Sequence, residues 1–261
     1  MRTRAWIVGL ALLMGAFARA DLVDGLVLYM PLDEGKGGTV QDLSPNGFVG
    51  ELVGSPEWVD GKFGKALRFK GATDYVRVPD HEAFHIEGAI TQAAWIYLDR
   101  LPSAHAIIFG TRVNNAPGRW IGFGYGMDPD NNIKVWTNGP NGGFLDVDDT
   151  KTRLEPGRWY YLAYTHTTDN NGLVRIFVDG VLTHEQESNN PVAPGAQTTD
   201  VTIGTWAGEA WPGIVDEVRL WNRALSPQEI AESMNLGADK LLAVDPAGKL
   251  ATRWGQLKTL R

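Results

Sequence analysis

Residues 156–182 read PGRWYYLAYTHTTDNNGLVRIFVDGVL and contain the clearest hairpin pattern in the chain. In LVRIFV (173–178), successive side chains alternate between two faces with the two-residue period of a β-strand. Asp179-Gly180 then separates this run from the next one. The pair predicts a tight turn, because both central positions of a type I′ turn need a positive φ. A strand, a tight turn and a returning strand indicate an antiparallel sheet.

The same pattern of short apolar runs separated by turn residues extends along most of the chain. In VDEVRLW (215–221) the alternation predicts two faces, one with Val215, Glu217, Arg219 and Trp221 and the other with Asp216, Val218 and Leu220. Many short strands joined by close turns are typical of a β-sandwich or barrel. The further runs are 26–32, 66–69, 75–78, 90–98, 107–109, 120–125, 133–136, 159–165, 201–203 and 214–221.

One short helix is predicted near the C-terminus. Ser226-Pro227-Gln228-Glu229 places serine at the N-cap, proline at the first helical position and glutamate at the third. This is a capping box, and it predicts a helix from about Pro227 to Asn235, with Gly237 at its far end. We interpret the helix as a lid or brace on the sandwich. The tail over residues 235–261 either packs back on the sandwich or lies loose, and the pattern favours neither.

The N-terminus carries the pattern of a secretory signal. Arg2 and Arg4 precede an uncharged apolar run over residues 5–17, and Ala18-Arg19-Ala20 then gives a small-residue cleavage site. The apolar run is shorter than the ~20 residues that a membrane span needs. The pattern therefore predicts a signal peptide over residues 1–20, an extracellular or periplasmic protein, and no membrane span.

Composition narrows the range of partners and of stabilising devices. The 261-residue chain has no cysteine, so no disulfide can hold the secreted protein together. Its formal net charge is −7, which repels phosphate backbones and argues against nucleic acid as a partner. The 31 glycines fit many turns, and the 10 tryptophans fit a large aromatic core or surfaces that stack on ligands.

Five segments in order resemble the laminin-G-like jelly rolls of the concanavalin A-like superfamily, in their bacterial secreted form. They are LYMPLDEGKGGTVQDLSPNGFVG (28–50), WVDGKFGKALRFKGATDYVRVPD (58–80), ITQAAWIYL (90–98), the stretch 156–182 and GIVDEVRLWNRALSPQEI (213–230). The resemblance implies an all-β fold, an antiparallel jelly-roll β-sandwich over residues 21–234 with one short C-terminal helix. It also implies binding of carbohydrates, glycoproteins or protein partners, often with a calcium ion.

Calcium is the best-motivated ion. Asp33, Asp42 and Asp216 fall in the opening and closing segments, which the fold should bring together, and calcium prefers several oxygen ligands. We therefore expect a structural calcium that joins the first strand to the last. The alternative is that Asp33 and Asp42 are turn residues and that Asp216 faces a basic neighbour.

Two other metal-like patterns are better explained without a metal. His81-Glu82-Ala83-Phe84-His85 spells H-E-x-x-H, but the flanking segments leave room for one helical turn at most, too little for a zinc-protease helix. Asp128-Pro129-Asp130-Asn131-Asn132 resembles the start of a calcium loop but has Ile133 where the loop needs glycine. We predict a hairpin turn at that position.

Catalysis is not predicted. Glucanases of the same superfamily are expected to carry E-x-D-x-x-E or E-x-D-x-E on one strand, and no glutamate of this chain has aspartate two residues later. Asp216 and Glu217 are adjacent, so a regular strand would direct them to opposite faces. The chain also lacks G-x-S-x-G and a P-loop.

Aromatic side chains are the candidates for ligand binding, because a sugar ring stacks on an aromatic face. The predicted binding residues are Trp206, Trp211, Trp120 and Tyr125, and Trp136 belongs to the same pool. The function we expect is non-catalytic recognition of an extracellular glycan or glycoprotein. The alternatives are a protein-binding adhesion or structural module and a polysaccharide-cleaving enzyme of the same superfamily.

Overall fold

The computed structural model describes residues 22–111, 113–116, 119–138, 144–167, 172–187, 199–206 and 208–242. The predicted signal peptide (residues 1–20) and the tail after residue 242 lie outside these residues. In the part of the chain that the structure describes, no helix has the length and apolar character needed to cross a membrane.

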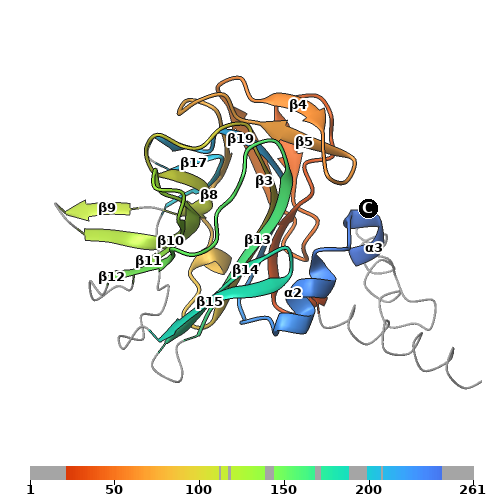
Figure 1. The fold of residues 1–261 in the computed structure, drawn as a ribbon. Helices are drawn as coiled ribbons and strands as arrows, with labels where there is room; N and C mark the ends of the chain where they lie inside the picture. Colours follow the sequence, from red (N-terminus) through yellow and green to blue (C-terminus); the bar gives the residue numbers. More distant parts are fainter. Residues whose placement is uncertain are drawn as a thin grey trace, which may run out of the picture.

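Two β-sheets face each other and form the body of the molecule (Figure 1). Almost all neighbouring strands are antiparallel, so the predicted jelly-roll β-sandwich is confirmed. The first sheet contains, in spatial order, β15 (Val181–Glu187), β14 (Leu173–Val178), β13 (Trp159–His166), β7 (Ile90–Leu98), β19 (Gly213–Trp221), β5 (Lys65–Arg68) and β4 (Glu57–Asp60), with β1 (Leu26–Met30) beside β19.

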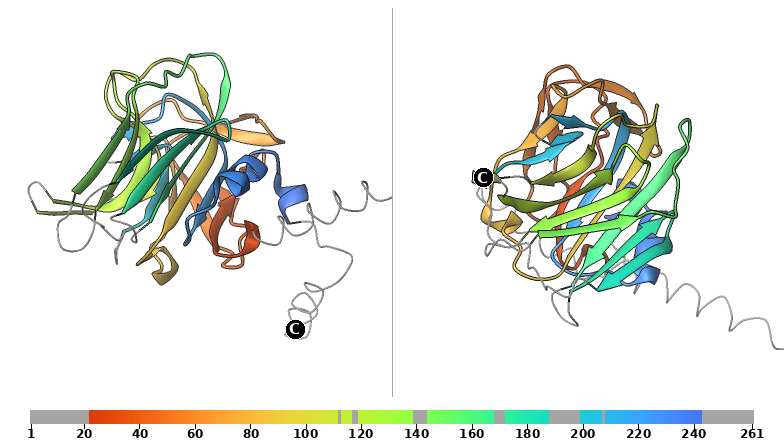
Figure 2. Two further views of the ribbon diagram at one scale, coloured as in Figure 1. Left: turned by 60° about the horizontal axis from the view of Figure 1, so that its bottom comes forward. Right: turned by 60° about the vertical axis from the view of Figure 1, so that its left-hand side comes forward.

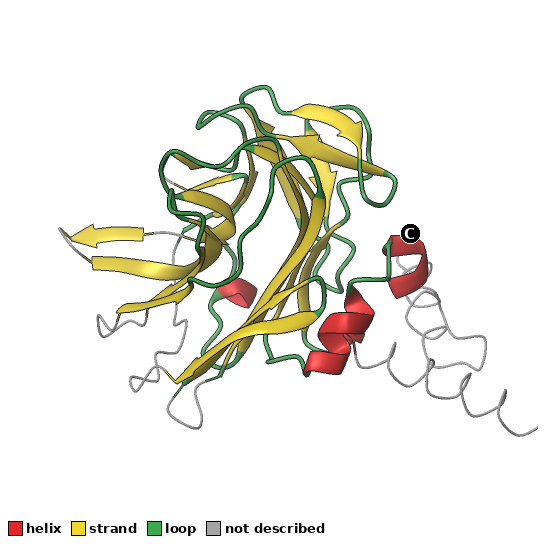
Figure 3. Cartoon of the chain, in the orientation of Figure 1, coloured by secondary structure: helices red, strands yellow, loops and turns green. Residues whose placement is uncertain are grey.

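The second sheet is larger and carries two short additions at its side. Its order is β12 (Phe144–Asp149), β11 (Ile133–Asn138), β10 (Arg119–Met127), β8 (Ala106–Thr111), β16 (Val201–Ile203), β6 (Tyr75–Val78), β3 (Val49–Val53) and β2 (Thr39–Gln41). The short strands β9 (Val113–Ala116), β17 (Thr205–Trp206) and β18 (Glu209–Ala210) attach to β10 and β8. Strands dominate the molecule, as the yellow elements of Figure 3 show.

The first sheet is covered on both faces, and this placement determines where a site can form. Its inner face shares the main core with the second sheet, and its outer face carries a second apolar cluster. Strand β7 shows both: Ala94 and Ile96 belong to the main core, whereas Ala93 and Trp95 belong to the outer cluster.

Two short helices cover this outer cluster, where the sequence predicted one. Helix α2 (Pro227–Ser233) has the predicted capping box, with the Ser226 hydroxyl accepting from the Glu229 N–H at 3.2 Å. Helix α3 (Ala238–Leu241) was missed, because Gly237 is its N-cap and not the end of α2. Leu241 is buried in the outer cluster, so the start of the tail packs on the sandwich (Figure 2).

The predicted alternation in 215–221 is wrong, because β19 contains a bulge. The backbone of Glu217 has a φ of +57°, and the pairing with β7 shifts register between Asp216 and Arg219. The extra residue moves Val215, Val218 and Leu220 to the main core together. Asp216 and Glu217 are consequently both fully buried, with neither exposed at the surface.

Candidate functional site

Two of the four predicted binding residues lie inside the protein and cannot stack on a ligand. Trp211 is fully buried in the main core. Tyr125 is 1% exposed, because the alternation of β10 directs it between the sheets, where its ring packs on Tyr164 at 5.5 Å. Both predictions are therefore wrong.

The other two predicted binding residues stand on the second sheet. Trp206 is on β17, paired with Glu209, and Trp120 is on β10, paired with Asn114. Their side chains lie outside the described part of the structure, so their binding roles stay predictions. The nearby Trp136 is 8% exposed and stands opposite Gly124 on the neighbouring strand.

The three aspartates predicted to bind calcium are not gathered into one site. Asp42 is committed to the backbone, because its two oxygens accept from Tyr29 N, Ser44 N, Ser44 Oγ and Phe48 N. In the described ranges, no group of three or more histidine, cysteine, aspartate or glutamate side chains could hold a metal ion. The expectation that Asp33, Asp42 and Asp216 share one ion is therefore corrected.

Asp33 and Asp216 still lie at the same loop, between β4 and β5. Asp33 Oδ1 accepts from Lys65 N at 2.7 Å, and Asp216 Oδ2 accepts from Lys62 N at 2.8 Å and Phe63 N at 3.0 Å. The other oxygen of Asp216, Oδ1, is buried and has no hydrogen-bond partner among the described residues. That oxygen is the feature that fits a cation.

Neither of the other metal-like patterns forms a metal site. Glu82–Phe84 is a single 3₁₀ turn, in which His81 caps the Ala83 N–H, and His85 pairs with Asp80 at 2.9 Å. The 128–132 segment is the predicted turn between β10 and β11, where Asp128 Oδ1 accepts from Asp130 N and Asn132 N, each at 2.9 Å.

A pocket of about 420 Å³ opens on the outer side of the first sheet, next to the end of α2. Five parts of the chain supply its walls: the β4–β5 loop, strand β7, the start of β13, the β14–β15 turn and the C-terminal end of α2. The lining residues are Lys62, Phe63, Trp95, Arg158, Trp159, Asp179, Met234 and Asn235.

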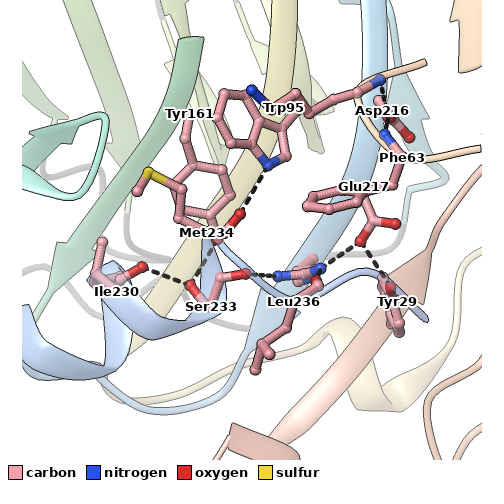
Figure 4. Close-up of polar contacts among 12 residues, drawn as sticks. Tyr29, Phe63, Trp95, Tyr161, Asp216, Glu217, Ile230, Ser233, Met234 and Leu236 are labelled. Carbon is pink, nitrogen blue, oxygen red and sulfur yellow. Dashed lines mark hydrogen bonds and ion pairs between the residues drawn. The ribbon is translucent and has the colours of Figure 1, made fainter. Parts of the chain in front are cut away.

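Trp95 is held in one orientation by the helix end. Its indole Nε1 donates to the carbonyl oxygen of Met234 at 3.1 Å, and its ring packs on Tyr161 at 5.4 Å (Figure 4). The hydroxyl of Tyr161 is hydrogen-bonded to that of Ser233 at 2.7 Å, which fixes α2 to β13. The tryptophan and the end of the helix therefore position each other.

The β4–β5 loop is anchored by the buried carboxylate of Asp216. Its Oδ2 accepts two consecutive backbone N–H groups, which places Lys62 and Phe63 in the pocket wall (Figure 4). Burial raises the pKa of Asp216 to about 8, and the two N–H groups oppose this shift. The Lys62 ammonium then lies 4.1 Å from the centre of the Trp95 ring.

The opposite wall is set by the β14–β15 turn that the sequence predicted. Asp179 and Gly180 have φ of +51° and +77°, as a type I′ turn requires. Asp179 Oδ1 accepts from Tyr161 N at 2.9 Å, and its Oδ2 accepts from Arg158 Nη2 at 3.0 Å. The turn thus holds Arg158 beside the partly exposed Trp159.

A buried ion pair supports the layer beneath α2. Arg219 is fully buried and contacts the Glu217 carboxylate and the carbonyl oxygens of Ser233 and Leu236. Glu217 Oε2 also accepts from the Tyr29 hydroxyl at 2.7 Å (Figure 4). Burial raises the pKa of Glu217, and Arg219 opposes that shift. This network ties the end of α2 and the segment after it to β1 and β19.

Sequence reasoning missed this pocket, although two signals for it were present. The hairpin turn at Asp179 and the PGRW start of β13 were both recognised, but only as fold signals. The remaining pocket residues, which include Lys62, Trp95 and Met234, come from segments far apart in the chain. Only tertiary contacts bring these segments together, so no local motif predicts the pocket.

The sequence model of the concanavalin A-like lectin/glucanases superfamily matches residues 70–231, over half of the chain. The chain belongs to this superfamily. The match includes Trp95, Arg158, Trp159 and Asp179 of the pocket lining, whereas Lys62, Phe63, Met234 and Asn235 lie outside it. No curated protein matches the sequence of this concanavalin A-like domain.

Several solved structures similar to this concanavalin A-like domain are binding domains. The binding domain of Paraclostridial Mosquitocidal Protein 1 has a TM-score of 0.65 at 16% identity, and the match covers 82% of this chain and 52% of that one. The receptor binding domain of botulinum neurotoxin C/D mosaic serotype has a TM-score of 0.63 at 12% identity, with 82% and 51% covered. This chain thus spans about half the length of those toxin domains.

A third similar structure is matched over nearly its whole length. Domain 4 of AbnA, an extracellular arabinanase from Geobacillus stearothermophilus, was solved in complex with arabinotriose. Its TM-score is 0.62 at 22% identity, and the match covers 80% of this chain and 98% of that domain. At these identities the likeness shows the fold alone.

Proposed function

We propose that this domain is a secreted, non-catalytic module that recognises an extracellular glycan or glycoprotein through the pocket beside α2. The observation that carries the proposal is a preformed cavity with two tryptophans, Trp95 and Trp159, and polar side chains at its rim. Its volume of about 420 Å³ lies within the usual range for small-ligand sites, roughly 300–1,000 Å³.

The chemistry of the walls suits a sugar. An aromatic face accepts the C–H groups of a sugar ring, while amide, guanidinium and carboxylate groups bind its hydroxyls. Asn235 and Arg158 are exposed at the rim and offer N–H donors, and Asp179 offers acceptors. Because the Trp95 indole is already hydrogen-bonded to the Met234 carbonyl oxygen, this side chain loses little conformational entropy when a ligand binds.

The comparisons support a binding module in general, because the similar solved structures include toxin binding domains and an arabinanase domain with bound arabinotriose. Secretion is part of the proposal and rests on the sequence pattern of residues 1–20.

The test is a polysaccharide array followed by titration of any glycan that binds. Trp159→Ala removes a partly exposed pocket tryptophan. We expect at least about tenfold weaker binding, because truncating an aromatic contact residue commonly costs this much binding free energy. The matched control is Trp58→Ala, a partly exposed tryptophan on β4 outside the pocket, which should bind as the wild type does.

Two outcomes would favour the alternatives. An array without binding, together with self-association in solution, would favour a protein-binding adhesion module. Release of reducing ends from any polysaccharide would mean that the domain is an enzyme and would overturn the proposal.

We also propose a calcium site, with the candidate ligands now limited to the two carboxylates beside the β4–β5 loop. The unpartnered, buried Oδ1 of Asp216 supports a cation there, with Asp33 as the other nearby carboxylate of the predicted set. Asp42 is left out, because its oxygens are already occupied by backbone and hydroxyl donors. Such an ion would stabilise the loop that carries Lys62 and Phe63 and would have no chemical role in ligand binding.

A further inference from the structure

The pocket is electropositive in a protein that is acidic overall. Its lining includes two cations, Lys62 and Arg158, and one carboxylate, Asp179. The whole chain has a formal net charge of −7. A local excess of one positive charge therefore lies at a cavity that two tryptophans also line.

Arg158 and Lys62 differ in how far they are neutralised. Arg158 Nη2 lies 3.0 Å from Asp179 Oδ2, so its charge is partly balanced. Lys62 Nζ has no carboxylate within ion-pair distance among the described residues, and it lies 4.1 Å from the centre of the Trp95 ring. Other lysines of the same region do have acidic partners, as Lys65 has Asp60 and Lys70 has Glu57.

The position of the Lys62 ammonium leaves its N–H donors available. An exposed cation–π contact contributes about 0.5–1 kcal/mol, whereas a hydrogen bond to a charged group contributes about 1.5–3 kcal/mol. An anionic group that enters the pocket would thus gain more from the ammonium than the ring does, and the exposed lysine can turn toward it without breaking an ion pair.

We infer that the pocket selects glycans whose sugars carry a carboxylate, that is, uronic acids. The sugar ring would lie against the partly exposed Trp159, and its carboxylate would take the N–H donors of Lys62 and Arg158. Trp95 is 6% exposed with Lys62 over its ring, so it supports the lysine and does not stack on the sugar. This inference rests on the proposed function and specifies the ligand class of the same pocket. A planar carboxylate suits the fork of the exposed Arg158 guanidinium, which donates from Nη2 to Asp179 and lies 4.2 Å from the centre of the Tyr160 ring.

The experiment compares one polysaccharide in charged and neutral forms. Polygalacturonate and its fully methyl-esterified form share a backbone and differ in the carboxylate charge, and a sulfated dextran supplies a different anion. We expect binding of polygalacturonate, at least about tenfold weaker binding of the ester, and a loss of similar size in Lys62→Gln. The matched control Lys70→Gln removes an exposed lysine outside the pocket and should change nothing.

The outcomes distinguish failure of the uronate inference from failure of the proposed glycan recognition. If the ester or a neutral arabinan binds as tightly as polygalacturonate, or if Lys62→Gln binds like Lys70→Gln, the uronate inference is wrong and glycan recognition stands. Preference for the sulfated dextran over polygalacturonate would overturn the carboxylate assignment. If no glycan binds the wild-type protein, the proposed function fails as well.

Discussion

His166, the last residue of β13, makes the stability of this domain depend on pH. Its side chain is fully buried, and neither ring nitrogen has a hydrogen-bond partner in the described part of the structure. Burial lowers its pKa from about 6.5 to about 4, because the charged imidazolium would be desolvated. Between about pH 6.5 and about pH 4, the unfolded chain therefore binds a proton at this histidine and the folded protein does not.

The sign and the size follow from linkage. Above about pH 6.5 the histidine is neutral in both states and the full stability is present; as the pH falls from there toward about 4, the unfolded state gains protons and stability is lost. The complete shift corresponds to about 3.4 kcal/mol, and about 2 kcal/mol of it falls between about pH 7.5 and about pH 5.

The measurement is urea-induced unfolding of the wild type and of His166→Leu at those two pH values. The leucine keeps the volume and cannot take a proton, so its free energy of unfolding should fall by about 2 kcal/mol less than that of the wild type. His85→Gln is the matched control, because His85 is at the surface and paired with Asp80. Equal losses in the wild type and His166→Leu would refute the reasoning.

Three further predictions concern packing, strand spacing and the ion. Arg219→Met should lower the free energy of unfolding by about 3–5 kcal/mol in urea titrations, because it leaves the buried Glu217 carboxylate without its cation. Gly126→Ala should destabilise by about 1–3 kcal/mol, since its new Cβ would lie 1.9 Å from Ala106 O, whereas Gly124→Ala, with nothing nearer than 3.5 Å, should stay within about 1 kcal/mol. Chelation should lower the melting temperature, calcium at a hundredfold excess over Kd should restore about 2.7 kcal/mol, and Asp216→Ala should melt identically with and without chelator.

Local sequence signals predicted the fold well because they act over a few residues. The Asp179-Gly180 turn and the Ser226 capping box were identified from neighbouring residue types alone, and both have the expected geometry. Helix α3 was missed because its stability comes from Leu241 packing on the outer cluster and not from a strong capping sequence.

The candidate site could not be predicted in the same way. Whether an aromatic side chain faces a ligand or the core depends on tertiary packing. Tyr125 is turned inward by the phase of β10, and Trp211, between β18 and β19, is buried in the main core. The bulge at Glu217 illustrates the difficulty. One extra residue in β19 moves every later side chain of the strand to the opposite face of the sheet from the one that simple alternation predicts. The pocket itself is assembled from distant segments, so its residues have no shared spacing to detect.

The double burial of the first sheet has a consequence for mutational tolerance. On β7 successive side chains are all confined, with Ala94 toward one core and Trp95 toward the other, so substitutions there affect folding before they affect recognition. Lys62, Arg158 and Asn235, by contrast, are exposed at the rim of the same pocket. New ligand preferences can therefore be selected by randomising these three positions while the strands beneath them stay constant.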